Sequence, residues 1–383
     1  MERRLNMLTH CHNIEDLRIA ARKRAHRMVF DYIDGAADDE AAMRNNGHQF
    51  SGYDLVHRVL TGVDQVDTST TLLGRKIDIP FIISPSAGNR LFHTQGERAV
   101  ARAASEFGTI YSLSTLSTVS IEEIGRLTSG PKWFQLYVWK DRGLVKEMLA
   151  RARMSGFEAL ILTVDMPITG NRERDLHNRF TIPPKITPAQ IWHALRAPRW
   201  TADYLMGPAI RYANLSADTP AISLAAFVAG QLHAGFNWRD AEWLLGEWNG
   251  PSVIKGVVDT DDAAKAVSTG FNAIAISNHG GRQLDASPAP IDMLPPIADK
   301  VGDAAELIVD GGIRRSTDIL KSLALGARAV SFARPYLYGL AAGGQQGVTR
   351  ALDLFTTSLR RDMVLLGVQS ISELNRDFVR RRA

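Results

Sequence analysis

Apolar and polar positions follow a regular rhythm from residue 80 onward. Short apolar runs each end in small or polar residues, and most are followed by a stretch with apolar residues at helical spacing. Runs that are apolar on both faces are typical of parallel strands covered by helices. The predicted strands are Phe81–Ala87, Ile110–Thr115, Trp133–Val138, Ala159–Asp165, Ser252–Val257, Ala273–Asn278, Glu306–Gly312 and Ala329–Pro335.

The intervening segments predict helices between most of these strands. Eight strand–helix units with strands buried on both faces favour a closed (β/α)8 TIM barrel over an open sheet. The clearest helical segments are Gly96–Phe107, Ile121–Leu127, Arg142–Met154, Thr260–Ser268 and Ser316–Leu325.

Two segments depart from the rhythm. Residues 12–70 form a predicted N-terminal helical segment, in which Ile14–Tyr32 has the apolar spacing of a single helix. Between the fourth and fifth strands, Met166 to Gly250 is far longer than a usual connection, and residues 181–240 are its inserted part. We expect one domain over residues 1–383, with the barrel at about 80–370.

The insertion has an unusual composition over Lys185–Tyr212. Aromatic, aliphatic and proline residues there accompany four cations and a single acid. This mixture predicts either an element that lies on a membrane surface or a lid over the site. The longest apolar run, Ala221 to Gly230, is too short to span a bilayer. The cations are Lys185, Arg196, Arg199 and Arg211, and the acid is Asp203.

Composition narrows the functional classes. Apolar residues make up 45% and charged residues 22%, which is enough for a large core. The net charge is +4, without a basic stripe interleaved with aromatics, so we expect no nucleic-acid partner. A single cysteine, Cys11, excludes an intrachain disulfide, and Met1–Leu8 lacks the apolar stretch of a signal peptide. We expect a cytoplasmic protein, at most peripheral on the inner face of the cell membrane.

Polar side chains gather at the carboxyl ends of the predicted strands, where barrels of this type build their sites. His279 can take a proton near neutral pH, and Arg282, three residues on, can hold a carboxylate. A base beside an anion clamp suits a substrate with a carboxylate next to the reacting carbon. The strand-end residues are Ser86, Ser114, Gln135, Tyr137, Thr163, Asp165, Lys255, Ser277, His279, Asp310 and Arg334.

Lys255 and the last two strand ends carry further chemistry. Lys255 could form a Schiff base, stabilise an electron-rich partner, or make an ion pair with Asp285 or Asp165. The motifs Asp310-Gly311-Gly312-Ile313-Arg314 and Ala333-Arg334-Pro335 follow strands seven and eight, where barrels often bind phosphate.

Taken together, the motifs make the chain resemble the FMN-dependent L-2-hydroxy acid dehydrogenase/oxidase family. That family includes glycolate oxidase, respiratory lactate dehydrogenase and (S)-mandelate dehydrogenase. The resemblance runs in order from about Ile14 to the C-terminus. Its motifs are Ser277-Asn278-His279-Gly280-Gly281-Arg282-Gln283-Leu284-Asp285, Trp133-Phe134-Gln135-Leu136-Tyr137-Val138, Thr163-Val164-Asp165, Arg172-Glu173-Arg174-Asp175, Lys255-Gly256 and Asp310-Gly311-Gly312-Ile313-Arg314.

The resemblance implies roles for matching residues and implies no metal. His279 is then the base, oriented by Asp165, and Lys255 stabilises the reduced flavin at its N1/O2 edge. The substrate-binding residues are Arg282, Arg172 and Tyr32 at the carboxylate and Tyr137 near the hydroxyl. The FMN-binding residues are Ser114, Gln135, Thr163 and Ser277 at the ring or ribityl chain, the Ser86-Ala87 backbone at N5, Asp310 at the ribityl hydroxyls, and Gly311, Gly312, Arg314, Ala333 and Arg334 around the phosphate.

The resemblance leaves the electron acceptor and substrate open. The insertion favours a quinone-type acceptor reached from a membrane surface, and an O₂-using oxidase that produces H₂O₂ is the alternative. Because the cavity wall near Ala87, Leu116 and the insertion lacks recognisable bulky aromatics, we expect lactate or an aryl 2-hydroxy acid to be preferred over glycolate. The family also implies a homo-oligomer, such as a homotetramer. A flavin-binding barrel without oxidation chemistry and a phosphosugar isomerase are competing hypotheses.

Overall fold

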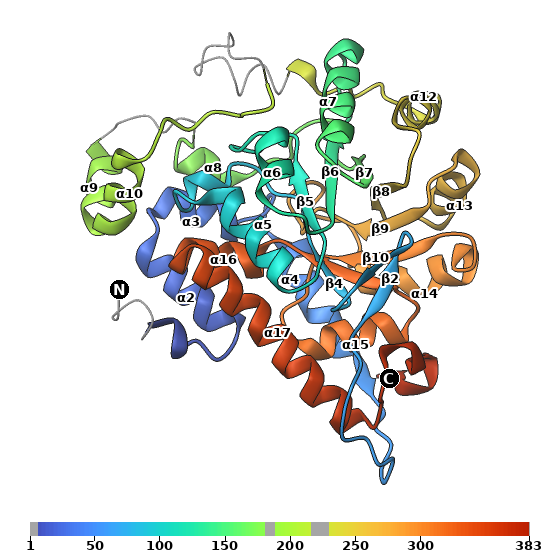
Figure 1. Ribbon diagram of the computed structural model, residues 1–383. Helices are drawn as coiled ribbons and strands as arrows, with labels where there is room; N and C mark the ends of the chain where they lie inside the picture. The colour runs from blue at the N-terminus through green and yellow to red at the C-terminus, as the bar shows by residue number, and fades with distance from the viewer. Residues whose placement is uncertain (1–6, 181–187, 216–229, 383) are drawn as a thin grey trace.

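The computed structural model describes residues 7–180, 188–215 and 230–382. In this part of the chain, eight parallel strands close into a barrel in chain order, and the last strand pairs back onto the first through Val330 and Phe81. Helices surround the barrel (Figure 1), which confirms the predicted TIM barrel. The barrel strands are β4 (Phe81–Ile83), β5 (Tyr111–Ser114), β6 (Lys132–Tyr137), β7 (Ala159–Thr163), β8 (Ser252–Val257), β9 (Ala273–Ser277), β10 (Glu306–Asp310) and β11 (Ala329–Phe332).

Three of the helices outside the barrel begin at side-chain caps that the sequence supplies. Ser120, Asp141 and Asp259 each accept a hydrogen bond from a backbone N–H of the first turn that follows. The helices that follow the strands are α5 (Gly96–Glu106), α6 (Ile121–Leu127), α7 (Arg142–Met154), α12 (Trp238–Trp248), α13 (Thr260–Thr269), α14 (Pro290–Val301), α15 (Ser316–Ala324), α16 (Arg334–Gly343) and α17 (Gln345–Leu366).

The barrel interior is a packed core rather than a channel. Ile82, Trp133 and Ile161 belong to one buried apolar cluster, and Leu72 and Ile77 extend that cluster to a hairpin. This hairpin consists of β2 (Thr70–Leu72) and β3 (Arg75–Ile77). The apolar side chains of the strands therefore pack in the core, and the polar side chains at the strand ends remain available to form the site.

The N-terminal segment contains two helices where the sequence pattern predicted one. The prediction of a single helix over Ile14–Tyr32 is wrong: α2 (Ile14–Arg24) and α3 (Arg27–Asp34) are separated by extended backbone at Ala25. His26 causes the second start, because its Nδ1 accepts a hydrogen bond from the Met28 N–H. Apolar spacing continues across this break and cannot reveal it.

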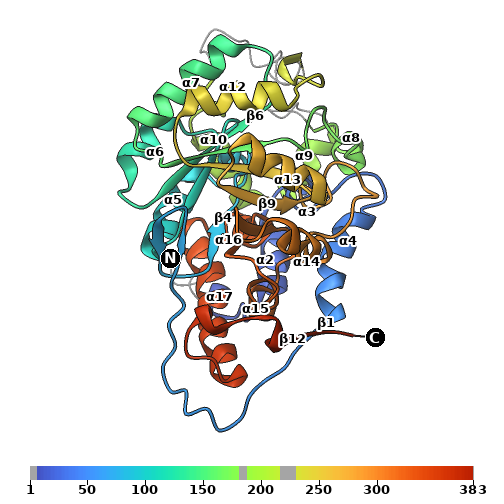
Figure 2. The same ribbon diagram turned by 90° about the vertical axis from the view of Figure 1, so that its right-hand side faces the viewer.

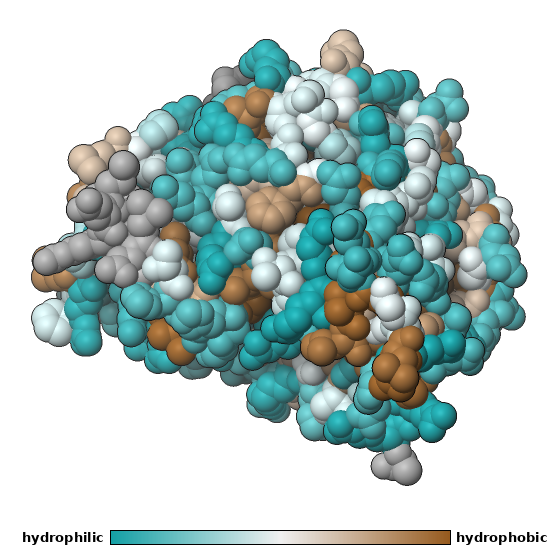
Figure 3. Space-filling model, turned by 60° about the horizontal axis from the view of Figure 1, so that its bottom comes forward, coloured by the Kyte–Doolittle hydropathy of each residue, from teal (hydrophilic) through white to brown (hydrophobic). Residues whose placement is uncertain are grey.

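A two-stranded sheet joins the N-terminal segment to the C-terminal end of the chain. After α4 (Ala41–His48), β1 (Tyr53–Leu55) pairs antiparallel with β12 (Val379–Arg381), as Figure 2 shows. On the lower face, hydrophobic groups lie among hydrophilic ones (Figure 3). The exposed apolar side chains of this region include Val59 and Leu60 in a loop and Val364 and Leu365 at the end of α17.

The insertion between β7 and β8 lies against the N-terminal helices (Figure 1). An ion pair between Arg24 and Asp203, and a hydrogen bond of 3.1 Å between His26 Nε2 and the Gln190 carbonyl, hold it there. Lys185 and residues 221–229, which belong to predicted features, lie outside the described residues. Among those described, no helix is long and apolar enough to cross a membrane. After β7 the connection forms α8 (Glu173–His177), and the insertion itself forms α9 (Pro188–Arg196) and α10 (Pro198–Met206).

Candidate active site

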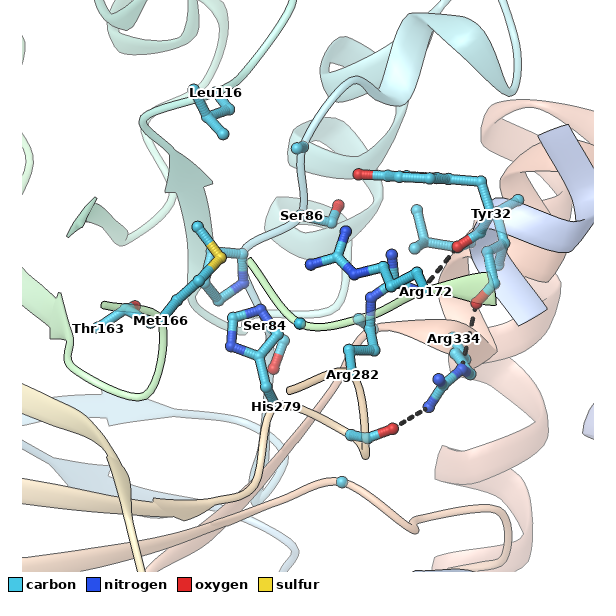
Figure 4. A pocket seen from close by; sticks show the side chains of 18 of the residues that line it. Tyr32, Ser84, Ser86, Leu116, Thr163, Met166, Arg172, His279, Arg282 and Arg334 are labelled. Atoms are coloured by element: carbon cyan, nitrogen blue, oxygen red, sulfur yellow. Dashed lines mark hydrogen bonds between the residues drawn. The ribbon is translucent and has the colours of Figure 1, made fainter. Parts of the chain in front are cut away.

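A cavity of about 510 Å³ opens at the carboxyl ends of the barrel strands (Figure 4). Of the residues predicted to form the site, all line this cavity except Asp165, Ser114 and Ser277. Those three lie just behind it. Asp165 bonds to His279, Ser114 to Gln135, and Ser277 to Lys255. The barrel thus gathers residues that are up to three hundred positions apart in the sequence.

His279 is oriented by Asp165. The distance from His279 Nδ1 to Asp165 Oδ1 is 2.8 Å. A carboxylate can only accept, so Nδ1 carries a proton, and in the neutral imidazole the lone pair is therefore on Nε2. The backbone of His279 is left-handed, with φ +57°, and its N–H donates to Ser277 Oγ at 3.0 Å. This strained turn aims the imidazole into the cavity.

The position of the Asp165 side chain depends on a glycine in the neighbouring strand β8. Gly256 has φ +110°, and a Cβ there would lie 2.6 Å from Asp165 Cβ. Only glycine lets β8 pass this close, and the strand register shifts at the same point, between Lys255 and Val257. Asp165 Oδ2 is buried and has no hydrogen-bond partner among the described residues.

Arg282 and Arg172 bring two guanidinium groups to the same cavity, as Figure 4 shows. Arg282 Nη1 donates to the Tyr32 carbonyl at 2.8 Å and to the Gly35 carbonyl at 2.9 Å. Arg172 Nε is buried without a hydrogen-bond partner in the described chain. Burial and the charge of Arg172 lower the pKa of Arg282 to about 10. The two cations repel each other, and Arg172 has an unused donor. An anion bound between them would relieve the repulsion and accept from that donor, so the pair forms a site for an anion.

Aromatic rings form the wall beside the arginines. The Tyr32 ring stacks on Phe180 with centroids 4.5 Å apart, and its centroid lies 4.9 Å from the Arg282 guanidinium carbon. Burial raises the pKa of Tyr137 and of Tyr212 above its usual range, so both phenols remain hydrogen-bond donors at neutral pH.

Phe180 and Tyr212 were not singled out in the sequence, and both line the cavity. The expectation that the wall near the insertion lacks bulky aromatics is therefore wrong. The richness of the insertion in aromatics was a signal, but spacing along a loop cannot show which ring turns inward. Phe180 and Tyr212 therefore form part of the cavity wall.

Lys255 is buried and bonded to Asp310. Its Nζ lies 2.5 Å from Asp310 Oδ2 and 2.9 Å from Ser277 Oγ. The predicted alternatives of an ion pair with Asp285 or Asp165 are wrong, and Asp285 instead accepts from the backbone N–H groups of Ala41 and Ala42 at the start of α4.

In the Lys255–Asp310 pair, each charge stabilises the charged form of the other residue. Burial alone would raise the pKa of Asp310, but Lys255 outweighs it and lowers that pKa to about 2. Burial likewise opposes the charge on Lys255, and Asp310 raises its pKa. Lys255 is therefore protonated at neutral pH, which disfavours the Schiff-base alternative because a protonated amine is not nucleophilic.

The far end of the cavity carries two more arginines, Arg314 and Arg334. Arg334 donates only to backbone carbonyls, from Nε to Ile33 at 3.1 Å, from Nη1 to Gly280 at 2.9 Å and from Nη2 to Gly35 at 2.8 Å. Since no carboxylate of the described chain pairs with it, its charge is available to a phosphate.

The remaining polar groups suit the cofactor that the sequence implied. Ser114 Oγ donates to Gln135 Oε1 at 3.1 Å, and Gln135 Nε2 donates to Thr163 Oγ1 at 3.0 Å, so three adjacent strands present a polar row. With a cationic end for phosphate, a protonated lysine in the middle and this row beside it, the cavity fits FMN chemically.

Fold and site together define a barrel enzyme that holds a phosphorylated cofactor next to an anionic substrate. Residues 21–381 match the model of the FMN-dependent dehydrogenase family. The chain belongs to this family, and it is therefore an FMN-dependent oxidoreductase.

Similar proteins cover nearly the whole chain. An L-lactate oxidase of Nostoc sp. is 40% identical over 371 residues, which are 96% of this chain and 97% of that protein. An L-lactate dehydrogenase of Caulobacter vibrioides is 40% identical over 375 residues, with the same coverage. The crystal structure of the monotopic membrane protein (S)-mandelate dehydrogenase has a TM-score of 0.94 at 35% identity, covering 97% of this chain and 100% of that chain.

Proposed function

We propose that this enzyme oxidises an L-2-hydroxy acid, lactate or an aryl acid such as mandelate, to the 2-oxo acid. The observation that carries the proposal is the shared cavity of His279, Arg172 and Arg282. His279, whose Nδ1 is bonded to Asp165, lines the same cavity as two guanidinium groups that would hold a carboxylate. The names of the relatives support the substrate class, since they are lactate and mandelate enzymes.

In the proposed reaction the protein binds the substrate and moves a proton. Arg172 and Arg282 bind the carboxylate, Tyr32 adds a hydrogen bond to it, and Tyr137 donates to the hydroxyl region. His279 Nε2 takes a substrate proton, and Asp165 stabilises the imidazolium that forms. When bound, FMN supplies the capacity to accept the two electrons that the substrate loses.

We assign the FMN-binding role to the opposite half of the cavity. Arg314, Arg334 and the backbone of Gly311, Gly312 and Ala333 hold the phosphate, and Asp310 accepts from the ribityl hydroxyls. The charged Lys255 would stabilise negative charge that develops on a reduced ring. Ser86, Ala87, Ser114, Gln135, Thr163 and Ser277 contact or support the ring and chain.

The test is anaerobic reduction of the purified yellow protein by L-lactate, (S)-mandelate and glycolate. We expect flavin absorbance near 450 nm to bleach with roughly one equivalent of lactate or mandelate, and more slowly with glycolate. Failure of all three acids to bleach a fully loaded enzyme would contradict the proposed function. Fastest reduction by glycolate would contradict only the substrate preference.

For the electron acceptor we propose a quinone at a membrane surface. Helices α9 and α10 expose Ile191, Trp192, Leu195, Leu205 and Met206, a mixture suited to the headgroup boundary. The alternative is direct reaction with O₂, and the names of the relatives include both an oxidase and dehydrogenases.

The two acceptors can be separated with a variant of α9. Trp192→Ser/Leu195→Ser should abolish vesicle binding and quinone reduction while dichlorophenol dye reduction is retained. Val364→Ser/Leu365→Ser removes two exposed apolar side chains from α17 and serves as the matched control. Rapid turnover with O₂ by an unmodified enzyme that ignores vesicles would establish the oxidase alternative.

A further inference from the structure

A second cavity, of about 660 Å³, lies on the other side of the N-terminal helices from the active site. It is bounded by the end of α2, by α3 and by α9 of the insertion, which lie together at one edge of the molecule (Figure 1). Cations dominate its wall. They are Arg18, Arg22, Lys23, Arg27, Arg174 and Arg196.

The wall of this basic cavity contains only two carboxylates, Asp31 and Asp34. Six cations against two acids leave an excess of four positive charges, with histidine counted as neutral. This local excess of positive charge favours an anionic ligand in the basic cavity.

The two carboxylates are already engaged. Asp34 accepts from Arg18 Nε at 2.5 Å and from Arg174 Nη1 at 3.1 Å. Asp31 lies 3.5 Å from Arg27 Nε. Three cations remain that pair with no carboxylate of the described chain: Arg22, Lys23 and Arg196.

Side-chain contacts hold the helices on either side of the basic cavity to each other. The ion pair of Arg24 with Asp203 joins α2 to α10. The His26 ring packs on Trp200 with centroids 5.0 Å apart and meets His193 of the wall edge-on at 5.7 Å. The cations of α2 and the cation of α9 are therefore held across the cavity from one another.

We propose that the basic cavity binds a phosphate-bearing anion, separately from the phosphate of FMN. A phosphate has the charge and the several acceptor oxygens that three unpaired cations can bond together. A smaller cavity, lined by Arg18, Asp34 and Arg174 on one side and by Gly312, Arg314 and Arg334 on the other, lies between the two sites. The phosphate could come from a free metabolite or from a lipid headgroup.

The test uses the FMN-loaded enzyme, so that the cofactor site is filled. Calorimetric titration with pyrophosphate at constant ionic strength should give saturable binding to one site. Arg22→Gln/Lys23→Gln should weaken it about tenfold or more, because two charge-assisted contacts are lost from a partly exposed place. Arg196→Gln should weaken it from the opposite wall. Arg239→Gln/Lys265→Gln removes the same charge from exposed positions on α12 and α13 and should change nothing.

A second arm identifies the source of the phosphate. Phosphatidylglycerol and phosphatidylcholine vesicles are sedimented with the same variants. Binding of pyrophosphate that depends on Arg22 and Lys23 supports a free phosphate compound. Dependence seen only with phosphatidylglycerol supports a lipid headgroup.

Two results would overturn the basic cavity as a site. One is that the unmodified enzyme binds neither pyrophosphate nor phosphatidylglycerol vesicles. The other is that Arg239→Gln/Lys265→Gln weakens binding as much as Arg22→Gln/Lys23→Gln does. Arg22 and Lys23 also lie in the last turn of α2, where cations stabilise a helix. If that is their only role, the variant will lower the melting temperature and leave both binding curves unchanged. None of these residues touches the active-site cavity, so dye-linked oxidation reports separately on the proposed function.

Discussion

At the scale of single residues, the site is organised by donors and acceptors that the protein leaves unused. Arg172 Nε and Asp165 Oδ2 are buried without partners in the described chain. Leaving a buried polar atom unpaired costs stability, so the free Nε of Arg172, which lines the cavity, favours an anionic ligand there. Because the site groups are already held in place, they need little rearrangement when charge develops on the substrate during the reaction.

His279 provides the first prediction at this scale. His279→Gln should keep the flavin absorbance but reduce the rate of anaerobic flavin reduction by at least ~10²-fold, because the general base is lost. The rate is followed by stopped-flow absorbance with L-lactate or (S)-mandelate. An unchanged rate would remove His279 from the proposed role.

The two arginines should respond differently to removal. Arg172→Met and Arg282→Met should each weaken product binding by roughly 1.5–3 kcal/mol, measured by titrating flavin absorbance with the 2-oxo acid. Of the two variants, only Arg282→Met should also lower thermal stability, since Arg282 bonds to the Tyr32 and Gly35 carbonyls and Arg172 does not. Equal melting temperatures for the two variants would contradict this division.

At the scale of elements, Asp34 joins four helices around the site. Located in α3, it accepts from Arg18 of α2, from Arg174 of α8 and from Tyr338 of α16. Burial would raise the pKa of Asp34, but these bonds outweigh it and lower the pKa to about 2. The next residue, Gly35, offers its carbonyl to Arg282 and Arg334, so this network also positions the site.

The network predicts an acid dependence of stability. With a folded pKa of about 2 against an ordinary 3.8, the unfolded chain binds more protons between these values. Asp34 therefore stabilises the fold by roughly 2 kcal/mol above pH ~4, and this contribution is lost as the pH falls towards ~2. Urea unfolding at several pH values should show a shallower acid slope for Asp34→Asn. Asp303→Asn, in an exposed loop, should keep the original slope.

At the scale of the whole molecule, the active site is made by parts that meet only in the folded chain. The N-terminal segment gives Tyr32, the connection between β7 and β8 gives Arg172, Phe180 and Tyr212, and the barrel strand ends give residues such as His279 and Lys255. FMN bound there should therefore stabilise the fold as a unit. The oligomeric state and the location in the cell stay predictions.

Cofactor removal tests this coupling. Flavin-free protein should gain about 2.7 kcal/mol of unfolding free energy when FMN is added at a hundred times its dissociation constant. Riboflavin at the same concentration should stabilise much less, because it cannot engage Arg314 and Arg334. Thermal melts with each compound provide the measurement, and equal shifts would exclude the phosphate role of these arginines.

The sequence by itself determined the barrel and nearly all the residues of its site. Strands buried on both faces require a short apolar run, and barrels place their chemistry directly after such runs, so both are local signals. His279, Arg282 and Lys255 could be found for this reason. The residue types also fixed the chemistry, since an imidazole, a guanidinium and an ammonium group have distinct charges near neutral pH.

Only the tertiary structure decided which partners these groups choose. Lys255 pairs with Asp310 rather than with Asp165 or Asp285, because β8 and β10 flank β9 in the closed barrel and bring the two side chains together. His26 interrupts the predicted helix through a cap that apolar spacing does not encode. Phe180 and Tyr212 turn into the cavity, and the basic cavity forms between helices far apart in the sequence. Contacts between distant segments depend on how those segments pack, and no local pattern records that.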